Sequence, residues 1–167
     1  MSMKQISVDK VTVNMGIGAP GAELDKAITI LKSITNAVPV KTVSRVKQPT
    51  WGLRPGLTIG AKVTLRKQKA LDFLKAAFGA KENTLSSKSF DNTGNFGFGI
   101  REYIDMPKVK YDPKLGIKGF DVLVCLRRPG YRVKSRKVRK ARIPRKHVIK
   151  KEEAIDFVKE KFGVQVE

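Results

Sequence analysis

The segment from Val122 to Lys151 contains thirteen lysine and arginine residues and no acidic residue. Held together without counter-charges, these side chains repel one another, and a polyanion relieves that repulsion. Nucleic acid is the commonest polyanion. Its charged part, residues 127–151, follows an apolar run and is followed by a helical pattern, so both its ends are tethered, unlike the ends of a solvated tail. Its few apolar residues do not supply the apolar face that a membrane-surface helix needs. We therefore interpret it as an RNA-binding segment.

Basic and acidic residues are also separated along the rest of the chain. A second acid-free span, from Lys26 to Leu71, holds ten more basic residues, and the net charge is +20 over 167 residues. Hydrophobic residues make up 41% of the chain, which is enough for a core and excludes a merely disordered basic tail. The length suits one domain. We expect a single domain, residues 1–167, in which residues 127–151 form the basic RNA-contacting segment.

Several classes of protein are excluded by what the chain lacks. A single cysteine, Cys125, cannot form an intramolecular disulfide, and with the single histidine, His147, it cannot build the usual zinc site. We expect no metal and no cofactor, and we expect His147 to be solvated or bound to phosphate. No apolar run approaches the roughly 18 residues that cross a membrane. The N-terminus has no apolar signal-peptide region. We expect a soluble, cytoplasmic protein without a membrane partner.

Apolar periodicity predicts the regular elements. Alternation predicts strands at Val11–Met15, Leu57–Arg66 and Phe96–Arg101, and an apolar run predicts a central strand at Phe120–Leu126, covered on both faces. Helical spacing predicts three helices, built on Leu24, Ala27, Ile28, Leu31 and Ile34, then on residues 67–78 before Gly79, and last on residues 152–162 before Gly163.

The remaining stretches are expected to connect these elements. Residues 38–47 look extended, and residues 80–95 are polar and loop-like. Two prolines and two glycines within residues 49–56 predict that this stretch forms no regular structure.

The order of elements predicts an α+β fold: a mostly antiparallel sheet with helices packed on one face, and a basic extension before the C-terminal helix. The opposite face of the sheet is then open, polar and basic. An open face of this kind can dock on RNA through phosphates, 2′-hydroxyls and base edges. It would carry Thr12, Asn14, Thr58, Lys62, Thr64 and Arg66.

Other motifs have competing interpretations. Gly16-x-Gly18-x-x-Gly21 matches the dinucleotide-binding pattern, but the extended stretch that follows the helix, VPVKTVSR, offers no acidic residue for a ribose, so a glycine-rich turn is favoured. Phe96 and Phe98 fill a core or stack on bases, with the core favoured. Trp51, in a Pro/Gly loop among basic residues, remains open between core and nucleobase stacking. Glu152 and Glu153 fit first-turn helix charges. Nothing resembles an activated nucleophile or an acid–base pair, so we expect no enzyme.

Several stretches resemble the family of large-subunit ribosomal protein five, the universal 5S rRNA-binding proteins. They are KVTVNMGIG, GLRPGLTIGAKVTLR, LSSKSFDNTGNFGFGIREYI and YDPKLGIKGFDV, in the family's order. The stretch RRPGYRVKSRKVRKARIPRKH is similar to archaeal and eukaryotic members, and the short N-terminus is closer to the archaeal type. The resemblance implies an α+β fold and four kinds of partner: 5S rRNA, large-subunit rRNA, P-site tRNA and neighbouring ribosomal proteins of the central protuberance.

The resemblance and the residue pattern together predict three sites. For 5S rRNA, the motifs place Asn14 and Thr64 on contact positions, and the open face adds Thr58, Lys62 and Arg66. Ala37 stands where the family often has Gln. For the P-site tRNA elbow, the resemblance implies a loop with Lys47, Gln48, Thr50, Trp51 and Arg54. The clamp on rRNA phosphates comprises Arg127, Arg128, Arg132, Lys134, Arg136, Lys137, Arg139, Lys140, Arg142, Arg145 and Lys146. The alternative function is a free-standing RNA-binding regulator or RNA chaperone.

Overall fold

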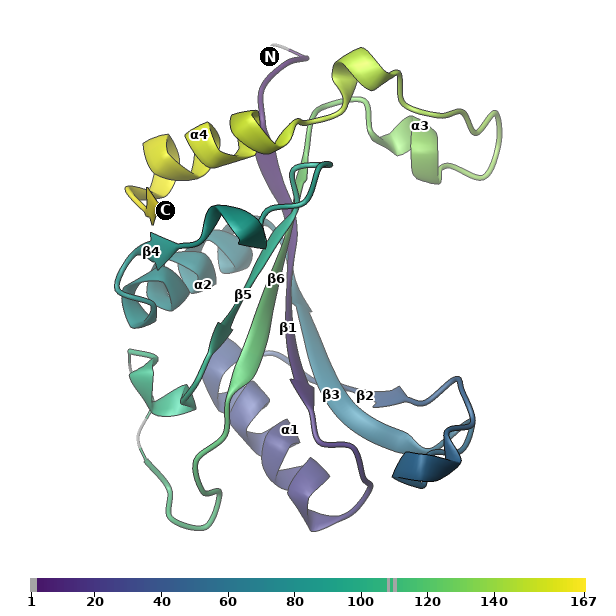
Figure 1. Ribbon diagram of the computed structural model, residues 1–167, viewed down its shortest axis with the longest axis vertical. Helices are drawn as coiled ribbons and strands as arrows, with labels where there is room; N and C mark the ends of the chain where they lie inside the picture. Colours follow the sequence, from purple (N-terminus) through teal and green to yellow (C-terminus); the bar gives the residue numbers. More distant parts are fainter. Residues whose placement is uncertain (1–2, 108, 110) are drawn as a thin grey trace. The chain divides into compact units, whose positions relative to one another are not determined.

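The structure is a computed structural model that describes residues 3–107, 109 and 111–167. Figure 1 shows the elements in chain order. They are β1 (Ser7–Gly16), α1 (Ala22–Thr35), β2 (Val40–Val43), β3 (Thr58–Leu65), α2 (Lys67–Ala80), β4 (Thr84–Leu85), β5 (Phe96–Ile100), β6 (Phe120–Arg127), α3 (Arg132–Ser135), α4 (Lys151–Phe162) and β7 (Gln165–Val166), with 3-10 turns at Pro49–Trp51, Ser87–Ser89, Tyr103–Asp105 and Arg145–His147.

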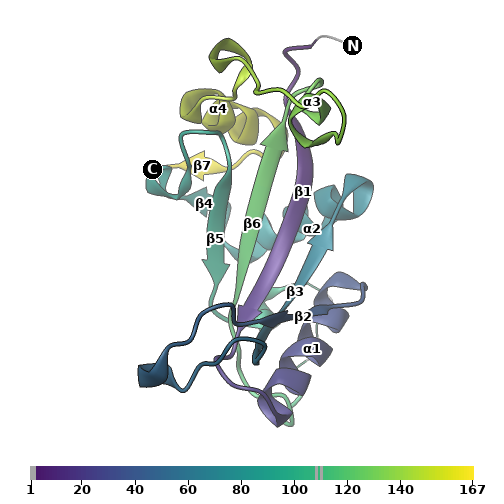
Figure 2. The ribbon, with the colours of Figure 1, turned by 90° about the vertical axis from the view of Figure 1, so that its right-hand side faces the viewer.

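A five-stranded sheet has the strand order β2-β3-β1-β6-β5, and β4 pairs with β7 as a separate parallel ribbon. The arrows of neighbouring strands in the larger sheet run in opposite directions in Figure 2, and the register of β2 against β3 is antiparallel. The α+β fold with a mostly antiparallel sheet is thus confirmed. The described chain forms two compact units, which we call unit 1 (residues 3–11, 66–98 and 123–167) and unit 2 (residues 12–65, 99–107, 109 and 111–122).

In unit 2, helix α1 packs on strand β3. The helix buries Leu24, Ala27, Ile30 and Leu31, as its spacing requires, and the strand buries Ala61, Val63 and Leu65 on its covered face. Ile28 and Ile34, which we expected in this core, are only half-buried. The helix ends at Asn36, whose left-handed backbone (φ 48°) lets its N–H bond to the carbonyl of Lys32.

In unit 1, a cluster of phenylalanine rings joins α2, α4 and β5. The ring of Phe78 lies 5.4 Å from that of Phe98, 6.4 Å from that of Phe96 and 5.2 Å from that of Phe162. Phe96 is 4% exposed and Phe98 is 8% exposed. Both aromatic residues therefore fill the core, as favoured from sequence, and neither is free to stack on a base.

The structure corrects several expected boundaries. Helix α2 does not stop at Gly79 but continues to Ala80, because the left-handed residues that turn the chain are Glu82 and Asn83. Residues 49–56 are not wholly irregular, since Pro49 begins a 3-10 turn, a position where its fixed φ is compatible with a helix. Residues 80–95 hold β4 and a 3-10 turn, and only Val40–Val43 of residues 38–47 form a strand.

Strand β6 lies inside the sheet, as expected, but it is covered on one face only. Phe120, Val122, Val124 and Leu126 are buried, whereas Leu123 between them is 48% exposed. The expectation that both faces are covered was therefore wrong.

Candidate RNA-binding surfaces

The polar side of β1 and β3 in unit 2 carries the first candidate surface. Asn14 and Thr58 are half-buried, and Lys62 and Thr64 are exposed, opposite the buried Val63 and Leu65. Among the described residues, none of these four polar side chains has a hydrogen-bond or ion-pair partner within the protein. We call Asn14, Thr58, Lys62 and Thr64 the open-face set. Their unsatisfied donors and acceptors are available to a ligand.

Gly60 allows β1 and β3 to approach closely beside this surface. A Cβ atom at residue 60 would lie 2.7 Å from the carbonyl oxygen of Met15 and 3.0 Å from Oγ1 of Thr42. Only glycine permits this close approach of backbone to backbone. The register of β2 also shifts between Thr42 and Val43, opposite this point.

Arg66 was predicted to belong with the open-face set, but it lies one residue beyond β3, in unit 1. Its Nη1 is 3.4 Å from Oδ1 of Asp9, and Nη1 of Arg127 is 3.1 Å from the same oxygen. Both arginine side chains remain more than half exposed, at 58% and 57%. One carboxylate thus orients two guanidinium groups that still face solvent.

The loop around Trp51 forms a closed turn. The backbone N–H of Gln48 donates to the carbonyl of Leu53 and that of Leu53 donates back to Gln48, both at 3.0 Å. Gly52 has φ 65°, a left-handed conformation that suits glycine. Trp51 is 73% exposed, so the structure excludes a core role for it. Lys47, Thr50 and Arg54 are also exposed, and Gln48 is half-buried.

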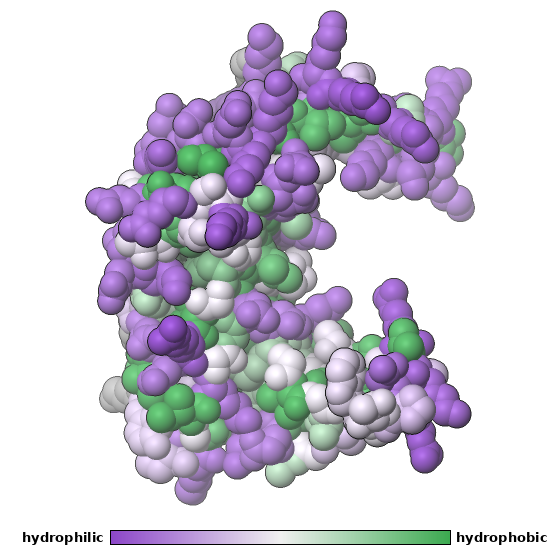
Figure 3. Space-filling view, in the orientation of Figure 1, coloured by the Kyte–Doolittle hydropathy of each residue, from purple (hydrophilic) through white to green (hydrophobic). Residues whose placement is uncertain are grey.

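The basic segment leaves the end of β6, forms α3 and returns to α4 (Figure 1). Figure 3 shows hydrophilic side chains crowding this part of the surface, with hydrophobic side chains between them. Ten of the eleven predicted clamp residues are exposed: Arg127, Arg132, Lys134, Arg136, Lys137, Arg139, Lys140, Arg142, Arg145 and Lys146.

Hydrogen bonds at its base hold the basic segment in place. The Tyr131 hydroxyl donates to the carbonyl of His147 and accepts from the N–H of Ile149, each at 3.1 Å. Nε2 of His147 lies 2.9 Å from the carbonyl of Pro129, and the imidazole ring stands edge-on to the Tyr131 ring. The expectation that His147 is solvated or phosphate-bound was wrong, because the imidazole is half-buried in this anchor. The one feature of the sequence that could have indicated this anchor is Tyr131, a tyrosine within a stretch of basic residues.

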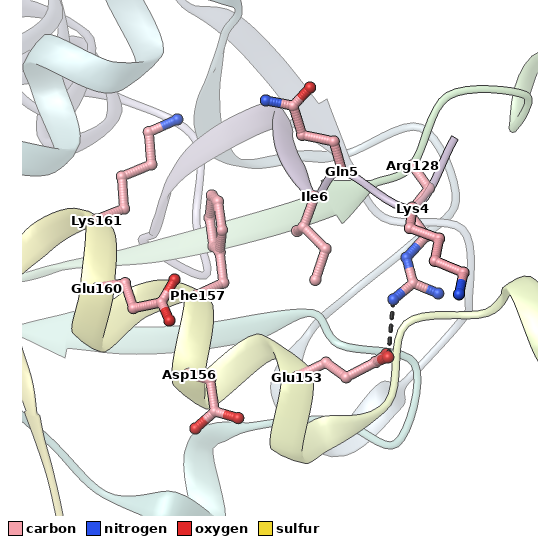
Figure 4. Close-up of a pocket in the computed structure, with 9 residues that line it drawn as sticks. All are labelled: Lys4, Gln5, Ile6, Arg128, Glu153, Asp156, Phe157, Glu160 and Lys161. Carbon is pink, nitrogen blue, oxygen red and sulfur yellow. Dashed lines mark hydrogen bonds and ion pairs between the residues drawn. The ribbon is translucent and has the colours of Figure 1, made fainter. Parts of the chain in front are cut away.

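Arg128 differs from the other clamp residues because it is 7% exposed. Its Nη2 donates to Oε1 of Glu153 at 2.8 Å, and its Nη1 lies 3.5 Å from the carbonyl of His147. Figure 4 shows this guanidinium at one end of a cavity of about 620 Å³, with Glu153, Asp156 and Glu160 projecting from α4. Arg128 therefore secures the base of the basic segment inside the protein and does not present its charge outward, which corrects its assignment.

Acidic side chains near these surfaces are engaged within the protein. The N–H of Lys150 and the Arg128 guanidinium hold the pKa of Glu153 below its ordinary value, as expected for a first-turn acid. In unit 2, hydrogen bonds from Lys118 and Lys26 lower the pKa of Glu23 to about 2. Among the described residues, Arg127, which pairs with Asp9, is the one exposed cation of the basic segment with an acidic partner, so the other exposed lysines and arginines keep their charge un-neutralised.

The glycine-rich stretch after β1 is a strand-to-helix turn. Gly18 and Gly21 have φ of 87° and 122°. The N–H groups of Ile17 and Gly18 both donate to the carbonyl of Ile59, at 2.9 and 2.8 Å. These two amides are therefore engaged within the protein and cannot cradle a phosphate, which favours the turn over the dinucleotide-binding interpretation.

Metal sites and membrane-spanning helices are both absent from the described residues. They contain no group of three or more His, Cys, Asp and Glu side chains placed to hold a metal ion. None of the helices in those same residues has the length and apolar character to cross a bilayer.

Exposed cations, unpartnered polar groups on a sheet and an exposed tryptophan define a nucleic-acid-binding protein. Residues 58–160 match the model of the C-terminus of the ribosomal L5 family, and residues 2–54 match that of Ribosomal protein L5. The chain therefore belongs to the ribosomal protein L5 family: it is a ribosomal protein and not an enzyme.

Relatives named large ribosomal subunit protein uL5 cover almost the whole chain. The protein of Methanococcus vannielii is 46% identical over 167 residues, 98% of this chain and 92% of the relative. The protein of Sulfolobus acidocaldarius is 47% identical, with the same coverage. That of Methanoregula boonei is 43% identical, covering 98% of this chain and 99% of the relative. These archaeal relatives confirm the archaeal type that the basic stretch indicated.

Proposed function

We propose that this chain is a structural constituent of the large ribosomal subunit that binds 5S rRNA in the central protuberance. The open-face set carries this proposal. Four polar side chains without partners lie on a sheet whose other face is packed, and polar groups of RNA can satisfy them. Asn14 and Thr64 also stand at the positions where the motifs of the family place 5S contacts. The names of the relatives support the assignment to the large subunit.

The basic segment is proposed to bridge to large-subunit rRNA. Its exposed lysines and arginines lack the aromatic and amide side chains that read bases, so contacts with phosphates dominate. Because Tyr131 and Arg128 secure the base of the segment, its charges are held on the protein and do not trail as a free tail. We propose that strands β1 and β6, which contribute residues to both units, join them into a single RNA-binding domain.

The closed turn at Gln48–Leu53 is proposed to contact the elbow of P-site tRNA. Trp51 presents an exposed indole, with Lys47 and Arg54 beside it in sequence. An aromatic face flanked by cations can stack on a base or ribose and attract phosphates at the same time. Neighbouring ribosomal proteins of the central protuberance are proposed as further partners.

A free-standing RNA-binding regulator is the second candidate, favoured by the high net charge of +20 alone. Co-sedimentation through a salt gradient separates the two. A structural constituent stays with large subunits at salt concentrations that strip weakly bound basic proteins, because shape and hydrogen bonds supplement its charge. A regulator is released and binds mixed RNAs without preference for 5S rRNA. Release at low salt would contradict our proposal.

A further inference from the structure

A cavity of about 840 Å³ lies in unit 1 beneath the basic segment, in the size range of pockets that hold small molecules. One wall comes from the sheet, with Cys125 and Leu126 of β6. The basic segment contributes Ala141, Ile143 and Val148 to the lining. Tyr131 also lines the cavity, and its ring is held in place because its hydroxyl makes two hydrogen bonds, to His147 and Ile149. Thr93 and Asn95 add polar groups to the lining, so the cavity offers apolar and aromatic surface with a few polar groups beside it.

The rim of this cavity is positively charged. Lys134, Lys140 and Arg142 from the basic segment and Lys10 from β1 all contribute to its lining. Asp9 is the one acidic residue that lines it, and its carboxylate is already bound by the guanidinium groups of Arg66 and Arg127. A cationic rim around an apolar interior is complementary to a molecule with a negative charge at one end and a flat apolar ring at the other.

We propose that this cavity binds one unpaired nucleotide of the RNA, with its base against the apolar interior and its phosphate on Lys134, Lys140 and Arg142. The inference rests on the proposed RNA-binding function and assigns base recognition to a segment otherwise proposed to contact only phosphates. Phosphates alone would not use the apolar walls, and a paired base is stacked inside its duplex. The cavity therefore selects single-stranded RNA, such as a bulged or looped-out residue.

Cys125 provides a direct probe of occupancy because it lines the cavity and is the only cysteine of the chain. The rate of its reaction with N-ethylmaleimide is measured on the full-length protein with three polyanions of matched charge: a single-stranded oligoribonucleotide, an RNA duplex and inorganic polyphosphate. We expect the single strand to slow alkylation at least about fivefold and the other two to change the rate less than about twofold. Equal protection by all three, or protection by none, would overturn the proposal.

A pair of variants tests the cavity independently of Cys125. Both residues are exposed, but Ala141 lines the cavity and Val138, which is 72% exposed, does not, so Ala141→Phe adds a ring to the lining and Val138→Phe adds the same ring elsewhere on the basic segment. We expect Ala141→Phe to weaken binding of the single strand about tenfold and Val138→Phe to leave it within about twofold. Equal affinities of the two variants would contradict the proposal.

Binding of 5S rRNA, measured in parallel on the same variants, separates this inference from the proposed function. If the cavity has no role but the proposed function holds, 5S rRNA binds normally and the single-stranded oligoribonucleotide does not slow the alkylation of Cys125. If the proposed function fails, 5S rRNA does not bind even to the unaltered protein.

Discussion

Arg128 and Glu153 form an ion pair across 25 residues of sequence, with Nη2 of the arginine 2.8 Å from Oε1 of the glutamate. The arginine side chain is 8% exposed and the glutamate side chain 42%. Among the described residues, Nε of Arg128 is a buried nitrogen without a hydrogen-bond partner. Since a buried guanidinium is costly without its counter-charge, Glu153 stabilises the point where the basic segment leaves the sheet.

Glu153→Gln should destabilise the protein in a pH-dependent way. The folded-state pKa of Glu153 lies below the ordinary 4.5, through the N–H of Lys150 and then the Arg128 guanidinium. A depressed carboxyl pKa stabilises the fold fully above the unfolded pKa and progressively less as the pH falls toward the folded pKa. We expect a loss of about 1 kcal/mol at pH 7, kept small by the partial exposure of the carboxylate.

Urea unfolding of wild type and variant between pH 7 and pH 3 measures this difference. It should shrink below about pH 4.5. Glu152→Gln is the matched control, because it removes a neighbouring first-turn charge that is exposed, and its effect should stay within about 0.5 kcal/mol. A difference that is equal at pH 7 and pH 3 would show that the carboxylate charge is not what binds Arg128.

Gly60→Ala should destabilise the protein by about 1–3 kcal/mol, because the new methyl group would lie 2.7 Å from the carbonyl oxygen of Met15 and force β1 away from β3. Gly99→Ala in β5 is the control, since its nearest neighbour is Oδ1 of Asp121 at 3.6 Å, an ordinary contact. Thermal unfolding compares the two. Similar losses of stability for both variants would mean that the close approach of β1 and β3 at Gly60 does not exclude a larger side chain.

Local patterns were sufficient to predict much of the fold. Alternation at Val11, Val13 and Met15 identified the buried face of β1, and the strand predicted from Phe96 to Arg101 is one residue longer than the observed β5. Gly79 shows the limit of such reasoning. A glycine near a helix end suggests a stop, yet the helix continues to Ala80 and the backbone turns left-handed only beyond it, at Glu82 and Asn83.

The parts of the candidate site that depend on charge alone could be predicted from the sequence. The parts that depend on contacts between residues far apart in the chain could not. Ten clamp residues are exposed as a charge run predicts. Arg128 lies among basic residues, as those ten do, but it pairs with Glu153 of another element, and no local pattern in the sequence indicates that pairing. The anchor of Tyr131 on His147 was missed for the same reason. Both are contacts that only the fold creates.

Trp51→Ala should weaken tRNA binding and leave stability and 5S rRNA binding unchanged. The indole is 73% exposed, so its removal should alter the free energy of unfolding by no more than about 0.5 kcal/mol. Lost stacking should cost about 1–3 kcal/mol in P-site tRNA occupancy of assembled subunits. Val46→Ala, at a residue that is 65% exposed, is the control. Impaired 5S rRNA binding with normal tRNA occupancy would reverse the assignment of the loop.

Replacing Lys137, Arg139, Lys140 and Arg142 by Gln should flatten the salt dependence of binding to large-subunit rRNA fragments. Each phosphate contact contributes roughly −0.7 to −0.9 to the slope of log affinity against log salt, so the slope should change by up to about 3 units. Thermal stability should barely fall, because all four side chains are exposed and like charges are removed. An unchanged slope would show that the basic segment is only a solvated connection.

Binding of isolated 5S rRNA to variants of the open-face set tests whether the polar side of β1 and β3 recognises this RNA. Asn14→Ala and Thr64→Ala should each cost about 1–3 kcal/mol in a filter-binding assay, because partners on the RNA would be left buried and unsatisfied. Lys32→Ala, at an exposed residue of α1, should bind like wild type. We expect the Asn14/Thr64 double variant to fold normally and to lose most of its affinity. A folded double variant with wild-type affinity would contradict this recognition.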